Sequence, residues 1–220
     1  MKANPDWATI AALIADPARA AMLSVLIGDI ALMAGELARL TKVTPQTAST
    51  HFAKLVKGNL VCVTKRGRHR YFRLSNRDVA QALEKLALIA PPTNLHSLNE
   101  TLERKALHRA RTCYDHLAGE LGVGWTQALI DKGFIRRHDE VYEITQIGEN
   151  RFHTFGIDCL KLQRKRRAFA RACQDWSERK PHIAGALRAA ILQRSLELKW
   201  IARLRGYRAI KVTEAGREWK

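Results

Sequence analysis

The stretch TPQTASTHFAKLVKGNLVCVTKRGRHRYFRL, residues 44–74, decides the fold. Its first half predicts a helix, because Thr44 suits the N-cap and Pro45 suits the first helical position, where no N–H is needed. Apolar residues then recur at helical spacing and form one stripe, made of Ala48, Phe52, Leu55 and Val56. Gly58 or Asn59 can adopt the left-handed conformation that ends a helix.

The opposite face of this predicted helix carries side chains that can hydrogen-bond, and none of them is acidic. They are Gln46, Thr47, Ser49, Thr50, His51 and Lys54. Such groups suit the base edges and phosphates of DNA. We expect the first five to enter the major groove and the lysine to contact the sugar-phosphate backbone.

Two strand-like runs follow the helix, Leu60–Val63 and Tyr71–Leu74, and a turn at Gly67 joins them. The turn is almost purely cationic, with Lys65, Arg66, Arg68, His69 and Arg70 around the glycine. This concentration of positive charge is unfavourable unless a polyanion neutralises it. The hairpin is therefore predicted to be a basic wing, whose lysine and arginine side chains contact phosphates or the adjoining minor groove of double-stranded DNA.

The whole chain of 220 residues carries a formal charge of +17, which indicates an acidic partner. Its 46% hydrophobic residues can fill one large core or two small ones. Nucleic acid is favoured over a membrane, because no apolar run approaches the roughly eighteen residues that a span needs. The alanine-rich N-terminus is interrupted by Asp6, Asp16, Pro17 and Arg19, unlike a signal peptide. We therefore expect a cytoplasmic protein.

Helical patterns flank the deciding stretch on both sides. Residues 6–27 predict two consecutive helices with a break at Asp16-Pro17, and Ala34 to Leu40 predicts a third helix that completes a helix-turn-helix. Asn76 caps a further helix, which ends before Pro91-Pro92 and is too apolar to stand alone. We expect this helix and the N-terminal helix to form the seam of a homodimer, with its recognition helices about one DNA turn apart.

Short motifs spread over residues 7–90 carry a family resemblance. They are Asp16-Pro17-Ala18-Arg19, Leu37-Ala38, Ser49, His51, Leu55, Asn59-Leu60-Val61, Gly67-Arg68 and Tyr71 through Leu74. With them the chain resembles the arsenic-repressor (ArsR) family of winged-helix transcription regulators. The resemblance implies a homodimeric DNA-binding repressor whose operator affinity is lowered by an effector. The effector is a small molecule or, often, a metal or metalloid.

Two features of the family's metal sensors are missing from this sequence. Sensors of thiophilic metals place cysteines in the short helix before the recognition helix, but residues 36–39 contain none. Sensors of zinc-like ions use Asp and His in the dimer helix, whereas residues 78–90 contain no histidine. The sensing chemistry of those relatives therefore cannot be transferred to this chain.

Beyond a proline-bounded linker near residues 92–98, the sequence repeats itself. HLAG at 116–119 recurs as HIAG at 182–185, and YEIT at 142–145 recurs as IKVT at 210–213. The repeats predict two domains: a winged helix-turn-helix DNA-binding and dimerisation domain at 1–92, and a sensing or dimer-supporting domain at 99–220.

Each repeat unit, about residues 109–155 and 169–220, reads as a degenerate winged helix. The predicted order is helix, HxAG turn, helix, hairpin and the start of another helix, and a basic helix around Cys159 to Arg171 is expected to connect the two units. The predicted fold class is mainly α with short β-hairpins (α+β).

The repeat places two thiols and two imidazoles at equivalent positions, Cys113 and His116 in one unit and Cys173 and His182 in the other. If the pseudo-symmetry brings them together, they form a Cys2His2 set of the kind that a zinc-like metal ion prefers. Cys113 and His116 are expected on one face of a helix, at positions i and i+3. Alternatively, each histidine hydrogen-bonds the turn before the next helix and each cysteine packs as a small apolar residue.

The sequence contains no glycine-rich phosphate loop, GxSxG, HExxH or suggestively paired carboxylates, so no enzyme activity is expected. The four cysteines form no CxxC pair and are interpreted as reduced thiols. The leading hypothesis is a sequence-specific regulator, a ligand-responsive repressor. The alternatives are a metal-binding or thiol-redox-responsive protein in which DNA binding is secondary, and a structural nucleic-acid-binding protein without an effector.

Overall fold

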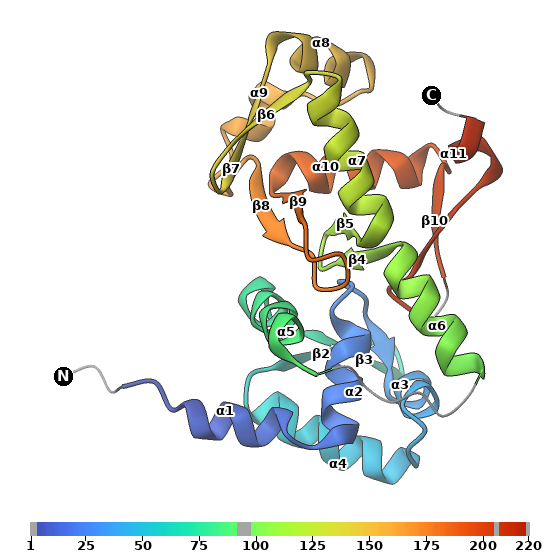
Figure 1. Cartoon of the computed structure of the whole chain (residues 1–220). Helices are drawn as coiled ribbons and strands as arrows, with labels where there is room; N and C mark the ends of the chain where they lie inside the picture. Colours follow the sequence, from blue (N-terminus) through green and yellow to red (C-terminus); the bar gives the residue numbers. More distant parts are fainter. Residues whose placement is uncertain (1–3, 92–97, 205–206, 219–220) are drawn as a thin grey trace. The chain divides into compact units, whose positions relative to one another are not determined.

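The computed structural model describes residues 4–91, 98–204 and 207–218, and the chain divides into two compact units (Figure 1). One unit comprises residues 1–86 with 205–208, and the other comprises residues 87–204 with 209–220. Residues 92–97, where the domain boundary is predicted, lie outside the described part. The two-domain boundaries 1–92 and 99–220 therefore stay a prediction.

Five helices begin in the N-terminal unit within the described residues, and the last of them continues three residues into the other unit. They are α1 (Trp7–Ile14), α2 (Pro17–Leu26), α3 (Ala34–Leu40), α4 (Pro45–Lys57) and α5 (Arg77–Ile89). Asp6 and Asp16 cap the first two helices by accepting hydrogen bonds from backbone N–H groups in the first turn. No single described helix is long and apolar enough to cross a membrane, although α1 and α2, bent by 91°, together meet that test by length and composition alone.

A three-stranded antiparallel sheet completes this unit. It contains β1 (Leu32–Met33), β2 (Val61–Arg66) and β3 (His69–Leu74) in the order β1-β3-β2. Gly67 turns the β2–β3 hairpin with a φ of +58°, a conformation that favours glycine. The stacked rings of Phe52 and Phe72, whose centroids lie 4.2 Å apart, pack α4 against the sheet.

Local sequence signals position α4 as predicted. Thr44 accepts a hydrogen bond from the Thr47 N–H at 3.2 Å, and Pro45 occupies the first helical position. Asn59 ends the helix in the left-handed region with a φ of +56°. Ala48, Phe52 and Leu55 of the apolar stripe are buried and Val56 is half-buried, so the polar stripe faces away from the core. The prediction of a helix followed by a wing is confirmed.

The C-terminal unit alternates hairpins and helices. Its helices are α6 (Leu98–Arg109), α7 (Gly119–Asp131), α8 (Gln146–Thr154), α9 (Cys159–Gln163), α10 (Ala186–Glu197) and α11 (Glu214–Glu218). Its strands are β4 (Arg111–Cys113), β5 (His116–Ala118), β6 (Ile135–His138), β7 (Val141–Ile144), β8 (Arg171–Gln174), β9 (Pro181–Ala184), β10 (Ile201–Arg203) and β11 (Ile210–Val212). The predicted α+β class is confirmed.

The two halves of the C-terminal unit share one element order: hairpin, helix, hairpin, helix. In the first half this is β4–β5, α7, β6–β7 and α8; in the second it is β8–β9, α10, β10–β11 and α11. The two halves also pack against each other, because α7 of the first half contacts β9 and α10 of the second half contacts β5. Figure 1 shows α7 and α10 crossing in the middle of the unit. The duplication of the sequence itself stays a prediction, which this shared order supports.

Both HxAG motifs end in a glycine that the backbone requires. Gly119 has a φ of +78° and Gly185 has a φ of +104°, and both are conformations that other residues rarely adopt. A Cβ at Gly119 would lie 2.3 Å from the His108 carbonyl oxygen, and one at Gly185 would lie 2.6 Å from the Phe169 carbonyl oxygen. Each glycine therefore lets the chain turn tightly from a strand into the following helix.

Two expectations for this unit are wrong. The segments before the HxAG motifs, Arg111–Cys113 and Arg171–Gln174, are strands and not helices. The predicted basic helix around Cys159 to Arg171 is shorter than expected and ends at Gln163. Arg167 instead forms an ion pair with Asp115 at 2.5 Å, and the chain continues into β8.

Candidate nucleic-acid interface and cysteine–histidine cluster

The polar face of α4 is exposed along most of its length. Gln46, Thr47, Ser49, Thr50 and Lys54 are all exposed, as a DNA-reading surface requires. The Ser49 hydroxyl donates to the Pro45 carbonyl oxygen at 2.9 Å, and the Thr50 hydroxyl donates to the Gln46 carbonyl oxygen at 3.2 Å. These local bonds leave the lone pairs of both hydroxyls open to donors on a base edge.

His51 lies differently from the other predicted contact residues. Its side chain is only 13% exposed, and its Nε2 lies 3.9 Å from Asp16 Oδ1 at the N-cap of α2. The histidine therefore sits where α4 meets α2 and contributes less surface to the polar face than its neighbours. Its assignment as a base-contacting residue stays a prediction.

The hairpin tip presents the cations of the predicted wing. Lys65, Arg66, Arg68, His69 and Arg70 are all exposed, and residues 61–74 contain no acidic side chain. Arg66 lies over the Tyr71 ring, 5.7 Å from its centroid, which holds this guanidinium close to the β-ribbon. The tip is thus a compact positive site next to the exposed face of a helix-turn-helix.

Comparison with known proteins agrees with this geometry. A helix-turn-helix domain family matches residues 14–64, from the end of α1 into β2. The chain is 47% identical over 214 residues to the uncharacterized HTH-type transcriptional regulator YdfF of Bacillus subtilis (strain 168), covering 97% of this chain and 95% of that protein. The chain belongs to the HTH-type transcriptional regulators. This family consists of DNA-binding regulators and not of enzymes.

Two solved structures are similar to part of this chain. HlyU from Vibrio cholerae N16961 is 26% identical, with 37% of this chain and 88% of that chain covered and a TM-score of 0.35. The cadmium metal-sensor CMTR from Mycobacterium tuberculosis is 29% identical, with 41% and 96% covered and a TM-score of 0.34. The domain match and the curated relative confirm the predicted helix-turn-helix transcription regulator.

In the C-terminal unit, the structure brings together the four residues of the predicted Cys2His2 set. The ligand atoms of Cys113, His116, Cys173 and His182 all lie within 4.8 Å of one another. The two histidine Nε2 atoms face each other at 3.1 Å. Three of the four side chains are buried and Cys173 is half-buried, so the cluster is largely shielded from solvent.

The strand register explains the convergence. Cys113 pairs with His116 across the β4–β5 hairpin, and Cys173 pairs with His182 across the β8–β9 hairpin. Directly opposed residues of antiparallel strands point to the same face of the sheet. The expectation that Cys113 and His116 share a helix face is therefore wrong, but a cross-strand pair presents thiol and imidazole together equally well.

Each histidine has a carboxylate on its other ring nitrogen. His116 Nδ1 lies 3.4 Å from Asp115 Oδ1, and His182 Nδ1 lies 3.4 Å from Asp175 Oδ2. The first contact is a hydrogen bond, whereas His182 Nδ1 has no hydrogen-bond partner among the described residues. An acceptor at Nδ1 fixes the ring orientation of a metal-binding histidine and leaves Nε2 to the ion.

Two arginines that the sequence did not single out hold these aspartates. Arg167 pairs with Asp115, and Arg111 pairs with Asp175 at 2.8 Å with both side chains fully buried. Burial opposes ionisation of Asp115, but His116 and Arg167 outweigh it and bring the pKa of Asp115 to about 2. Burial is likewise outweighed at Asp175, where Arg111 and the Gly119 N–H lower the pKa.

The cluster favours a thiolate at Cys173. Hydrogen bonding with Cys113, and then with His116 and His182, lowers the pKa of the Cys173 thiol well below its usual value against the effect of burial. Burial lowers the pKa of His182, whereas Asp115 and Cys173 raise the pKa of His116 against the same effect of burial. The shifts at Cys173 and His182 favour the thiolate and the neutral imidazole, which are the forms that bind metal ions, whereas the raised pKa of His116 favours its protonated form.

The other two cysteines lie outside this set. The Cys62 thiol on β2 lies 3.7 Å from the Leu74 carbonyl oxygen. Cys159 is buried at the start of α9, and burial raises the pKa of its thiol to about 11. A thiol of such high pKa reacts poorly, so Cys159 serves packing.

Proposed function

We propose that this transcription regulator is a homodimeric repressor whose operator affinity responds to an effector bound by the C-terminal unit. The observation that carries its DNA-binding mode is the exposed, non-acidic face of α4 next to a cationic wing. The family membership supports DNA binding, and the chemistry of the cluster supports an effector site apart from the DNA-binding surface.

In this proposal, α4 enters the major groove and the wing follows the backbone. Gln46, Thr47, Ser49 and Thr50 read base edges, and Lys54 contacts phosphate together with the wing cations. The residues that read base edges give sequence preference, while the cations that contact phosphate give salt-dependent affinity for any DNA. Because its target is chromosomal, we place this regulator in the cytoplasm.

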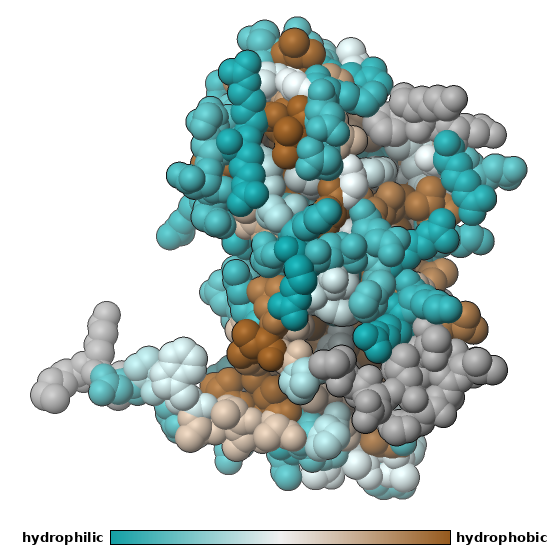
Figure 2. Space-filling model, in the orientation of Figure 1, coloured by the Kyte–Doolittle hydropathy of each residue, from teal (hydrophilic) through white to brown (hydrophobic). Residues whose placement is uncertain are grey.

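An exposed apolar face supports the homodimer. Helix α1 has no buried residue, and Trp7 is 81% exposed. On α5, Leu86 is 42% and Ile89 is 81% exposed, and Figure 2 shows brown, apolar atoms exposed where Figure 1 places this helix. Large apolar side chains exposed on neighbouring turns of one helix mark interaction sites. A second copy of the chain would cover them by a self-complementary contact.

The DNA-binding mode predicts different consequences for Thr50→Ala and Arg68→Ala. Affinities are measured by fluorescence anisotropy on a duplex selected by the protein from a random pool and on an unselected duplex. Thr50→Ala should weaken the selected duplex about tenfold and leave the other unchanged, because a base contact is lost. Arg68→Ala should weaken both duplexes equally and lower the slope of log K against log salt by about 1.

Arg136→Ala is the matched control for this experiment, since Arg136 is exposed on β6 and outside the proposed DNA-binding surface. It should leave both affinities unchanged. Equal losses on both duplexes for Thr50→Ala and Arg68→Ala would show that α4 does not read the sequence.

A second candidate function is metal binding or thiol redox response, and the Cys2His2 geometry favours the metal. We infer that Cys113, His116, Cys173 and His182 bind a zinc-like ion. Four protein ligands form a closed site, which is typical of structural and regulatory zinc and not of catalytic zinc. Since each hairpin supplies one thiol and one imidazole, the ion would link the two halves of the C-terminal unit.

Metal analysis tests this inference. The protein, purified in the presence of zinc and then dialysed, should contain about one equivalent of zinc per chain. Cys113→Ser and His182→Ala should each lower the zinc content strongly, whereas Cys62→Ser should not, because Cys62 lies outside the set. The inference would be contradicted if the unmodified protein contained no zinc, or if both cluster variants contained as much zinc as the unmodified protein.

A further inference from the structure

A second site lies in the C-terminal unit, in a cavity of about 380 Å³. Helices α7, α8 and α10 line it with residues of the following loops, and the lining is mostly aromatic or aliphatic. The aromatic residues of the lining are Trp125, Phe134, Phe152, Phe155 and Trp200. A concave apolar site of this size accommodates a compound of one or two rings.

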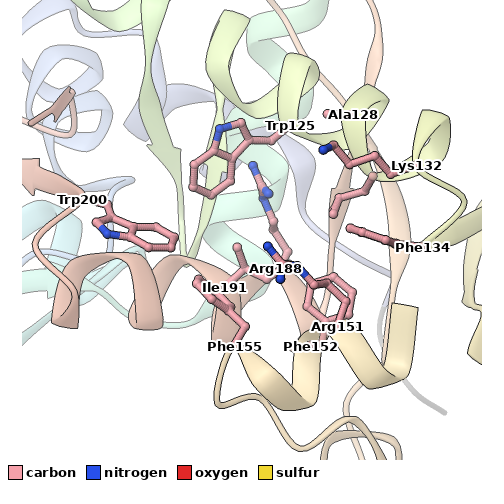
Figure 3. A pocket seen from close by; sticks show the side chains of 11 residues that line it. Trp125, Ala128, Lys132, Phe134, Arg151, Phe152, Phe155, Arg188, Ile191 and Trp200 are labelled. Atoms are coloured by element: carbon pink, nitrogen blue, oxygen red, sulfur yellow. The ribbon is translucent and has the colours of Figure 1, made fainter. Parts of the chain in front are cut away.

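Arg188 on α10 supplies a buried positive charge to this cavity. Its side chain is fully buried, and Figure 3 shows it among the lining residues, extending from α10 toward Trp125. Its guanidinium carbon lies 5.1 Å from the centroid of the Trp125 ring. The strongest polar contact of Arg188 within the described residues is a long one, from Nη2 to the Gly122 carbonyl oxygen at 3.5 Å.

The remaining donors of Arg188 are unpaired. Its Nε and Nη1 are buried and have no hydrogen-bond partner among the described residues. Burial lowers the pKa of the guanidinium to about 9, so the group is still charged at neutral pH. A buried charge without a counterion is unfavourable, because the loss of hydration is not offset.

This situation contrasts with Arg111, the other large and fully buried arginine of the unit. Arg111 forms a 2.8 Å ion pair with Asp175. The lining around Arg188 contains no acidic residue, and its other charged members, Lys132 and Arg151, are both cationic and exposed. The protein therefore leaves the charge of Arg188 without a carboxylate of its own, at the wall of an apolar cavity.

We propose that this cavity binds an aromatic carboxylate, whose carboxylate group pairs with Arg188 while its rings pack between the aromatic side chains. A planar guanidinium can meet a carboxylate along one edge, where the free Nε or Nη1 donor and the second N–H of Nη2 form a bidentate pair. Lys132 and Arg151 raise the local concentration of anions by attraction over a longer range. The cavity is separate from the cysteine–histidine set, with no residue in common.

The charge of the ligand is the property to test first, on the unmodified regulator. Binding of 2-naphthoate and of its neutral counterpart, naphthalene-2-methanol, is measured by isothermal titration calorimetry in the absence of DNA. The carboxylate should bind at least about tenfold more tightly, because its ion pair with a buried cation adds to the burial of the same rings. Decanoate, an aliphatic carboxylate, should bind less tightly than 2-naphthoate, because it cannot stack on the aromatic lining.

Variants then locate the binding site. Arg188→Met keeps the length and apolar stem of the side chain and should abolish the preference for the carboxylate, with the alcohol still bound. Arg136→Met, at an exposed position outside the cavity, should bind both compounds as the unmodified protein does. Circular dichroism confirms the fold of each variant. If Arg188→Met does not fold, Lys132→Met and Arg151→Met provide the comparison and should each weaken carboxylate binding by a few-fold.

Three results would overturn the proposal. One is equal affinity of the unmodified protein for 2-naphthoate and naphthalene-2-methanol. Another is tighter binding of decanoate, which would assign the cavity to aliphatic acids. The last is the absence of carboxylate binding at ligand concentrations up to about 1 mM. All three are independent of operator binding and of zinc content, so the proposal can fail while the proposed function stands.

Discussion

At the residue scale, Asp175 is the carboxylate that compensates a buried positive charge in the interior of the C-terminal unit. This carboxylate is fully buried and accepts hydrogen bonds from Arg111 Nη2 at 2.8 Å and from the Gly119 N–H at 2.7 Å. It also accepts from Ser177 and from the Glu178 N–H, so both of its oxygens have partners. Its loss would leave Arg111 as a second buried and uncompensated charge.

We predict that Asp175→Ala destabilises the metal-free protein by about 3 kcal/mol or more, the range found when one partner of a buried ion pair is removed. The free energy of unfolding is measured by urea denaturation followed by circular dichroism. Asp131→Ala, at an exposed position on α7, should change it little. A similar small effect for Asp175→Ala would mean that the buried pair contributes no net stability.

The four candidate ligand residues of the cluster were predictable from the sequence, but the arginines that pair with the neighbouring aspartates were not. Cys113, His116, Cys173 and His182 were recognisable because the repeat puts two residue types with metal chemistry at equivalent positions. Arg111 pairs with Asp175 across 64 residues, and Arg167 pairs with Asp115 across 52. No local pattern encodes such distant pairs. The one signal for Arg188 was a charge within the apolar run ALRAAIL, and its meaning depends on a cavity that the sequence does not show.

At the element scale, α4 and the wing were predictable because their signals are local. A cap, a proline, a helical stripe and a glycine turn lie within about thirty residues and point to one structure. The β4–β5 hairpin gave no such signal. Its strands have three residues each, and its turn contains Tyr114 at a φ of +58°, a conformation that bulky residues seldom adopt.

The packing of the halves against each other explains the β4–β5 hairpin. Helix α10 covers β5 and helix α7 covers β9, so each hairpin is stabilised by the half to which it does not belong. The periodicity of a sequence indicates only the local preference for helix or strand, and here tertiary contacts override that preference.

The proposed homodimer can be tested by substitutions on helix α5. Leu86→Glu combined with Ile89→Glu should convert a dimer into a monomer, because two carboxylates would be desolvated at the seam. Sedimentation velocity at micromolar concentration measures the change. Lys85→Glu, at an exposed position on the same helix, should leave the dimer intact. An unmodified protein that is monomeric, or a double variant that stays dimeric, would contradict a seam on α5.

At the scale of the whole molecule, the chain combines two kinds of chemistry. The N-terminal unit carries exposed hydrogen-bond donors and cations, whereas the C-terminal unit encloses a thiol–imidazole set and a cavity with a buried arginine. The chain lacks the cysteines and histidines that metal sensors of the ArsR family use in their DNA-binding domain. We therefore propose, as the central claim about the regulator, that the C-terminal unit controls DNA binding.

The most direct test of this claim is the operator affinity of one preparation with and without zinc. Fluorescence anisotropy at fixed salt concentration, with zinc content measured on the same samples, should show that stoichiometric zinc lowers the affinity at least about fivefold. His182→Ala should show no response to zinc, and Cys62→Ser should respond as the unmodified protein does. If zinc binds stoichiometrically and the unmodified protein holds its operator with the same affinity in both states, the metal site does not control DNA binding.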